Sequence, residues 1–276
     1  MTILDQHVLA TQRAFDGVAA GYDTVVAPNR MLQAIRDRTR AAVAERVPPG
    51  GRLLDLGCGS GLDAVWFGHQ RYRVVAVDGS RAMVEEAQRR VSAEGLAPSI
   101  DVQHCAIEEV DRAGLGVFDA VYSDLGPLNC VDDLASAARK IAGVLRPDGT
   151  LVASVMARVC IPEIALYTAR GRFARARVRF AKGAVPVPLG GGVVATRYYN
   201  PREFQRPFVA AGFVRESLRG VGTVVPPPYC DAFAARRPVL ITTLQRIDAV
   251  LGAWPIVRAT GDHIVIVLRK TDGRVS

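Results

Sequence analysis

The sequence lacks any long apolar run, and no stretch approaches the roughly 20 residues that a membrane-spanning helix needs. Its first residues, Met1 to His7, also lack the basic and then apolar pattern of a secretory signal. Both absences argue against an integral membrane protein and against a secreted one. We therefore expect a cytoplasmic protein without a transmembrane segment.

Cysteine and histidine are scarce, and neither forms a metal or catalytic pattern. The five cysteines lie far apart and show no C-x-x-C spacing, which disfavours both a disulfide framework and a zinc site. The four histidines belong to no Ser-His-Asp or zinc-hydrolase constellation. We accordingly predict no metal and assign no catalytic base.

Lysine is nearly absent, because Lys140, Lys182 and Lys270 are the only three, so arginine carries almost all of the formal net charge of +8. Residues 158–182 hold seven basic residues against the single acid Glu163, an excess of six positive charges. The sequence leaves three interpretations open for this segment. It could contact an anionic small molecule, bind nucleic acid with a steep salt dependence, or form a solvated basic face.

A glycine-rich loop is the most informative feature that is present. Residues 53–63 read Leu-Leu-Asp-Leu-Gly-Cys-Gly-Ser-Gly-Leu-Asp, which predicts a strand, a tight turn and a helix that begins near Leu62. Glycines let the backbone approach a ligand closely, and a helix start adds unpaired N–H groups beside it. The surface suits a nucleotide-like ligand, but Leu62 occupies the sixth position of G-x-G-x-x-G, so the dinucleotide fingerprint is not met.

Two aspartates narrow the chemistry of that ligand. Asp55 precedes the first glycine by two residues, where its charge would repel a pyrophosphate and attract an ammonium or a sulfonium. Asp78 ends a second apolar run, residues 74–77, twenty-one positions after Gly57. At that spacing an acidic side chain accepts hydrogen bonds from ribose hydroxyls. Together the residues indicate a nucleoside with a cationic tail.

Residues 53–63, followed by Val77-Asp78-Gly79-Ser80, resemble the first two motifs of the class I S-adenosylmethionine-dependent methyltransferases. The resemblance implies S-adenosylmethionine as the cofactor. It also implies an α/β, Rossmann-like fold with a seven-stranded, mostly parallel sheet and helices on both faces. It covers about residues 14–156 well and the remainder, where such enzymes select their acceptors, poorly.

The resemblance further implies a set of cofactor contacts. Tyr22, in a segment that folds over the cofactor, would approach its methionine end, with packing on the core as the alternative. Cys105 stands where relatives commonly have an acid that recognises the adenine, so we expect backbone groups of Ala106 and Ile107 to read the base instead. The expected cofactor set is Tyr22, Asp55, Gly57, Cys58, Gly59, Gly61, Asp78, Gly79, Met83, Ala106, Ile107 and Ser123.

We predict a single methyltransferase domain over the whole chain, with two insertions. Its expected parts are a helical cap at 10–46, the cofactor-binding core at 47–156, a lid inserted after the fifth strand at 157–199, and the C-terminal part of the sheet at 200–276 with a second insertion at about 221–262. Within the second insertion, Leu240, Leu244, Ile247 and Leu251 recur at helical spacing, which favours a helix that covers the core.

The loop after the fourth strand, residues 123–130, bears on the acceptor. It lacks the Asn/Asp-Pro-Pro-Tyr/Phe tetrad of enzymes that methylate exocyclic amines of bases, and the Pro-Cys nucleophile of cytosine-carbon methylators. We therefore expect methyl transfer, in the form of O-methylation, to a small-molecule or lipid-like metabolite, and the six-charge positive excess of residues 158–182 favours an acceptor that carries an anionic group. The expected acceptor contacts are Asn129, Arg170, Tyr198 and Tyr199. RNA- or DNA-directed methylation and non-catalytic cofactor binding are the alternatives, and the sequence does not indicate the oligomeric state.

Overall fold

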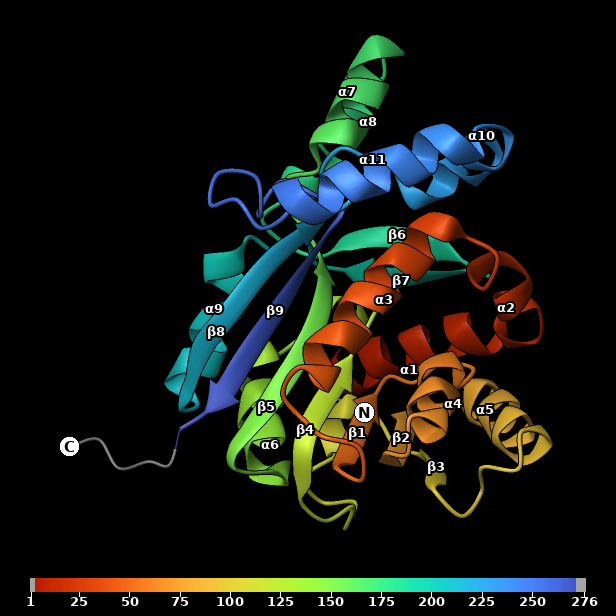
Figure 1. The fold of residues 1–276 in the computed structure, drawn as a ribbon, viewed down its shortest axis with the longest axis vertical. Helices are drawn as coiled ribbons and strands as arrows, with labels where there is room; N and C mark the ends of the chain where they lie inside the picture. The colour runs from red at the N-terminus through yellow and green to blue at the C-terminus, as the bar shows by residue number, and fades with distance from the viewer. Residues whose placement is uncertain (1–2, 272–276) are drawn as a thin grey trace.

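A seven-stranded sheet with the strand order β3-β2-β1-β4-β5-β9-β8 forms the centre of the computed structural model, which describes residues 3–271 (Figure 1). Only β9 runs antiparallel to its neighbours, β5 and β8. The strands of the sheet are β1 (Arg52–Leu56), β2 (Arg73–Asp78), β3 (Ile100–His104), β4 (Phe118–Ser123), β5 (Leu145–Met156), β8 (Phe213–Val221) and β9 (His263–Lys270). The predicted fold, a mostly parallel Rossmann-like sheet, is confirmed.

Helices cover both faces of the sheet (Figure 1). On one face α3 (Arg30–Ala44), α4 (Leu62–His69) and α5 (Arg81–Ala93) bury residues such as Ile35, Phe67 and Val84. On the other face α6 (Leu134–Val144) and α9 (Pro201–Ala210) bury Ile141 and Phe204. Because both faces are covered, the central strands are largely buried and mostly apolar, as is typical of parallel strands between two helical layers.

The remaining elements surround one end of the sheet. They are α1 (Ile3–Asp16), α2 (Ala19–Val26), α7 (Ile161–Ala169), α8 (Phe173–Ala176), the strands β6 (Val185–Leu189) and β7 (Gly192–Thr196), α10 (Asp231–Arg236) and α11 (Pro238–Leu251). β6 and β7 form a separate antiparallel hairpin, and β7 packs against α1. The N-terminal helical region therefore begins at Ile3, seven residues earlier than the expected cap at 10–46.

The insertion at 157–199 divides into two unlike parts. Its helical part, α7 and α8, stands away from the sheet, whereas the β6–β7 hairpin packs against α1 through β7 (Figure 1). Arg179 attaches the insertion to the sheet: its guanidinium binds both carboxylate oxygens of Glu163, at 2.8 and 2.9 Å, and Asp262 at 2.6 Å. All three side chains are nearly buried.

The helix predicted over about 239–251 is α11, but two of its four predicted core residues do not face the core. Leu240 and Ile247 are each 45% exposed. The helix is held instead by Ile241, which is buried, and by Asp248, whose carboxylate accepts hydrogen bonds from backbone N–H groups of residues 222–224. Within residues 3–271 no helix is both long enough and apolar enough to cross a bilayer.

Candidate functional site

The glycine loop between β1 and α4 has the backbone that only glycine adopts readily. Gly57 has φ +78°, and a Cβ there would lie 2.5 Å from the ring of Pro127 in the loop after β4. Gly61 has φ +80°, and a Cβ there would lie 2.9 Å from the Ala87 methyl group on α5. Glycine at these positions therefore allows two neighbouring segments to close on the loop.

Asp78, the last residue of β2, lies directly beside this loop. Its Oδ2 accepts a hydrogen bond from the Gly59 N–H at 2.9 Å, and its Oδ1 accepts one from the Ser80 N–H at 2.8 Å. Each carboxylate oxygen can accept a further hydrogen bond. Burial raises the pKa of Asp78, an effect that the two backbone donors oppose.

Two acids of the N-terminal helices hold those helices on the same loops. Asp16 of α1 accepts hydrogen bonds from the Ser80 hydroxyl and from the Ala82 N–H. Asp23 of α2 accepts from the Ser60 hydroxyl and forms an ion pair with Arg90. The N-terminal segment is thereby fixed over the carboxyl ends of β1 and β2.

A cavity of about 300 Å³ lies between the glycine loop and these helices. This volume is at the lower end of the range that binds small molecules. Its wall comes from α1, the glycine loop, the ends of β2 and β4, the segment 105–108 and the hairpin. Beyond the predicted residues, the wall includes His7, Val8, Thr11, Gln12 and Phe15 of α1, Arg36, Asp63, Glu108, Asp124 and Pro127, Met156, and Val187, Leu189, Val194 and Thr196 of the insertion.

The charge of the cavity wall is mostly negative. Asp63, Asp78, Glu108 and Asp124 line it, whereas Arg36 is the only arginine or lysine among its described lining residues. Low-dielectric walls strengthen such a field, which favours a cationic ligand. Tyr22 also lines the cavity, and burial raises its pKa to about 12, so its hydroxyl is a hydrogen-bond donor at neutral pH.

Helix α3 contributes a buried polar network to this wall. Arg36 and Arg40, one turn apart, both pair with Asp63, the latter through Nε at 2.7 Å. The hydroxyls of Thr39 and Ser154 donate to Oδ1 of Asp124. Arg36 Nε and Asp124 Oδ2 are buried and have no hydrogen-bond partner among the described residues. Both orphaned atoms belong to residues that line the cavity, where a ligand could satisfy them.

Nine of the twelve expected cofactor residues line this cavity. They are Tyr22, Gly57, Cys58, Gly59, Asp78, Gly79, Met83, Ala106 and Ile107. They come from four segments that are distant in the sequence, and the structure brings them together at the carboxyl ends of β1, β2 and β3.

The other three expected cofactor residues do not line it. Asp55 is 2% exposed and lies on the same side of β1 as Leu53, toward the α3 and α4 layer, because strand side chains alternate. Burial, and then the charge of Asp63, raise the pKa of Asp55 well above its usual range. Gly61 packs against α5, and the Ser123 hydroxyl donates to the Leu56 carbonyl at 2.9 Å.

The structure does not bring the four expected acceptor residues to the cavity. Asn129 is buried, and its side chain hydrogen-bonds backbone groups of Met156 and Arg197. Arg170 is exposed at the end of α7. Tyr198 lies beneath the guanidinium of Arg179, and Tyr199 is in the core. Packing and backbone hydrogen bonds use the side chains of Asn129, Tyr198 and Tyr199, and Arg170 is exposed, so the expected contacts of these residues with an acceptor stay a prediction that the geometry does not favour.

The acidic and arginine residues of the wall that the sequence did not predict are Arg36, Asp63, Glu108 and Asp124. A partial signal existed for two of them: Arg36 and Arg40 recur at i and i+4 on an otherwise amphipathic helix, and Asp124 directly follows an apolar strand. Within residues 3–271 no group of three or more His, Cys, Asp or Glu side chains has the arrangement of a metal site.

The chain is similar in sequence to known methyltransferases, and its fold superposes on solved structures. Residues 54–153 match the family model described as methyltransferase domain. The ubiquinone/menaquinone biosynthesis C-methyltransferase UbiE of Geotalea uraniireducens is 32% identical over 168 residues, which are 59% of this chain and 68% of that protein. The malonyl-[acyl-carrier protein] O-methyltransferase of Enterobacter lignolyticus is 26% identical over 86% of this chain and 89% of its own length. The crystal structure of the [4+2]-cyclase SpnF superposes with a TM-score of 0.65 at 18% identity, over 95% of this chain and 96% of that one.

Proposed function

The chain belongs to the class I S-adenosylmethionine-dependent methyltransferases, and from this premise we propose that it methylates a small-molecule acceptor in the cavity between the glycine loop, α1 and the β6–β7 hairpin. The observation that carries the proposal is the mostly acidic cavity of about 300 Å³ directly over that loop. Its charge suits a cofactor that carries a sulfonium and an ammonium group.

The residues of the cavity wall fit S-adenosylmethionine. Asp78 has free acceptor capacity for ribose hydroxyls beyond its bonds to Gly59 and Ser80. Met83 and Ile107 offer apolar contacts for the adenine. The unpartnered Nε of Arg36 suits the methionine carboxylate. When bound, this cofactor supplies an electrophilic methyl group on its sulfonium.

We assign Asp124 as the general base that acts on the acceptor. It lies at the carboxyl end of β4, where ligands of open α/β sheets gather, and its Oδ2 is without a partner. Burial and the charge of Asp63 raise the pKa of Asp124 toward neutral pH, which favours a role as a general base. Asp124 would take the proton of an acceptor hydroxyl as the oxygen–methyl bond forms and the methyl–sulfur bond breaks. This assignment favours O-methylation.

The apolar part of the wall bears on the class of acceptor. Val187, Leu189 and Val194 of the hairpin, with Met156 and Phe15, form a surface that suits an aromatic or lipid-like group. The arginines of α7 and α8 do not contribute to the wall, so among the described residues Arg36 is the one arginine or lysine that the cavity offers an anionic acceptor. Phenols and quinols are therefore preferred acceptors over carboxylates in this proposal.

Calorimetric titration with S-adenosylhomocysteine tests the cofactor site. Replacing Asp78 by Ala removes an ionised acceptor whose hydrogen bonds are each worth about 1.5–3 kcal/mol, so affinity should fall by about tenfold or more. Asp101→Ala is the matched control, because Asp101 is an exposed aspartate on the neighbouring strand β3. Equal affinity in the wild type and Asp78→Ala would overturn the assignment of Asp78.

Turnover is tested with S-adenosylmethionine and a panel of phenols, quinols and carboxylic acids, with S-adenosylhomocysteine formation as the readout. We expect turnover with a phenol or quinol. Tight cofactor binding with no turnover across the panel would favour a non-catalytic binder or a different acceptor class over the proposed acceptor.

A further inference from the structure

Helix α11 presents an apolar stripe to solvent. Val239, Leu240, Ile247 and Val250 recur at spacings of one helical face and are 79%, 45%, 45% and 61% exposed. Trp254 and Ile256, just beyond the helix, extend the stripe and are 55% and 89% exposed. Single exposed apolar side chains are common, but four on one face of a helix, with two more within six residues of its end, indicate an interaction surface.

The stripe is not needed to hold α11 in place. The opposite side of the helix is anchored by Ile241, in a small core with Met31, and by Asp248, which accepts hydrogen bonds from three backbone N–H groups and the Thr223 hydroxyl. The helix therefore has a fixed inner face and an apolar outer face without a partner among the described residues.

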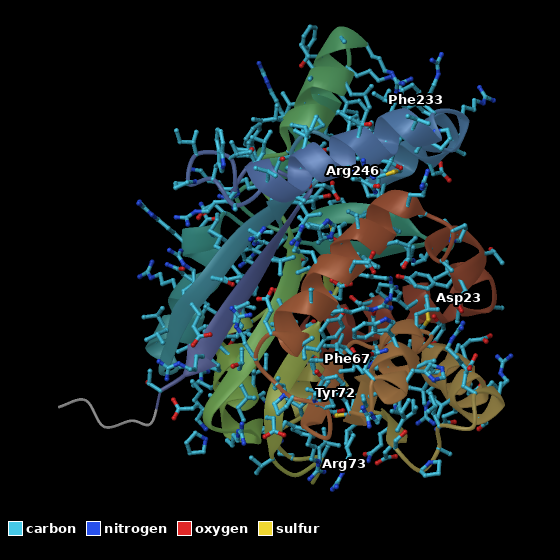
Figure 2. All side chains as sticks on the ribbon, viewed as in Figure 1. Asp23, Phe67, Tyr72, Arg73, Phe233 and Arg246 are labelled. Carbon is cyan, nitrogen blue, oxygen red and sulfur yellow. The ribbon has the colours of Figure 1, made fainter. Side chains whose placement is uncertain are left out.

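Basic side chains border the stripe. Arg236 and Arg237 directly precede the helix, Arg246 lies on it beside Ile247, and all three are exposed. Between residues 231 and 256 the only exposed acid is Asp231. Phe233 and Arg246 lie at the end of the molecule that α7 and α8 also occupy (Figures 1 and 2). Those two helices and the turns beside them carry the exposed arginines 170, 172, 175 and 177.

We propose that this surface, the apolar stripe with its bordering arginines, docks on an anionic membrane surface. Aliphatic and tryptophan side chains flanked by arginines are the composition by which a helix lies in a lipid interface, the apolar side chains in the acyl boundary and the cations among acidic headgroups. The inference goes beyond methyl transfer and does not depend on the identity of the acceptor.

The charge and composition of the surface favour an anionic membrane over two other partners, a second copy of the chain and a nucleic acid. A second copy of the chain, related by a twofold axis, would place this basic surface against itself, which like charges oppose. A nucleic acid would meet the arginines, but the stripe offers it aliphatic side chains and a single tryptophan, not a series of stacking aromatics. An anionic lipid surface matches both the apolar and the basic residues.

Vesicle flotation of the full chain tests the proposal. We compare vesicles of phosphatidylcholine alone with equimolar phosphatidylcholine and phosphatidylglycerol, at low and high salt. The wild type should float with the anionic vesicles and be released by salt, because screening weakens surface electrostatics. Arg236→Gln/Arg237→Gln/Arg246→Gln should lower partitioning at least about tenfold, since each cation near an anionic surface contributes about fivefold.

A second variant tests the apolar stripe. Ile247→Ser/Val250→Ser/Trp254→Ser should lower partitioning by a similar factor through lost insertion. The controls are Val117→Ser and Arg112→Gln, exposed residues in the loop before β4 at the far end of the sheet. Far-ultraviolet circular dichroism and S-adenosylhomocysteine affinity should match the wild type in all variants, because none of these residues lines the cavity.

Three results would overturn the proposal. The first is failure of the wild type to float with anionic vesicles, and the second is an equal loss in the control variants. The third is concentration-dependent dimerisation or duplex binding that the same variants abolish while flotation persists, since the surface would then belong to a second copy or to nucleic acid.

Discussion

Asp124 shows how a single side chain can be prepared for proton transfer. Thr39 and Ser154 occupy one carboxylate oxygen through their hydroxyls, which fixes the orientation of the group, and the other oxygen has no partner among the described residues. Burial, followed by the charge of Asp63, raises its pKa. A base with these properties gains proton affinity without losing its position.

Asp124→Asn should lower kcat by about 10²–10⁴-fold with a phenol or quinol that turns over, while leaving S-adenosylhomocysteine affinity close to the wild type. The base acts deprotonated, so the wild-type rate should fall as the pH drops below the raised pKa of Asp124, and the variant should lose this dependence. A pH–rate profile beside calorimetry measures both. An unchanged profile in the variant would show that Asp124 is not the base.

At the level of elements, the position of the β6–β7 hairpin depends on its close contact with α1. Gly190, in the hairpin turn, has φ +56°, and a Cβ there would lie 2.5 Å from Val18 Cγ1 and 3.0 Å from the Ala14 carbonyl oxygen. Gly191 has φ +79° but no atom within 4 Å of such a Cβ. The two glycines therefore share a left-handed backbone and differ in contact.

Gly190→Ala should displace the hairpin from α1 and weaken S-adenosylhomocysteine binding by about tenfold, or about 1.4 kcal/mol, because both elements line the cavity. Gly191→Ala carries the backbone strain without the clash and serves as the matched control. Calorimetry on the two variants measures the difference. Equal S-adenosylhomocysteine affinities of the two variants would mean that the contact between the hairpin and α1 does not determine the shape of the cavity.

At the scale of the whole molecule, a buried ion-pair cluster stabilises the attachment of the insertion, since Arg179 pairs with Glu163 of the insertion and with Asp262, which directly precedes β9. Arg179→Met leaves two buried carboxylates without their cation and should lower the free energy of unfolding by about 3–5 kcal/mol. Urea denaturation measures the free energy of unfolding of the wild type and the variant. Arg177→Met, an exposed neighbour, should stay within about 0.5 kcal/mol of the wild type.

The same cluster sets a pH dependence of stability. Burial alone would raise the pKa of Asp262, but the charges of Arg179 and His263 hold it well below its usual range. A carboxylate with a depressed pKa in the folded state stabilises the fold above the unfolded pKa, about 3.9, and this contribution is lost as the pH falls further. The wild type should therefore lose more stability than Arg179→Met below about pH 4, and parallel curves would contradict this reading.

Local sequence patterns were sufficient to predict the elements around the glycine loop. The strand, glycine loop and helix at 53–63, and the aspartate that ends the next strand, were predicted from residue types and spacing alone, and nine of the expected residues line one cavity. This was possible because backbone conformation and the end of a parallel strand depend on near neighbours in the sequence. The family and the sheet followed from the same residues.

Only the tertiary structure decided which side chains reach the cavity at its acceptor end. The direction of Asp55 depends on which face of β1 meets α3, and Asn129 and Tyr199 are taken up by packing that joins segments about 30–70 residues apart. The hairpin supplies the apolar wall, and the basic part of the insertion turns to solvent. Charge and periodicity state what a segment can contact, but which of its faces is covered depends on long-range packing.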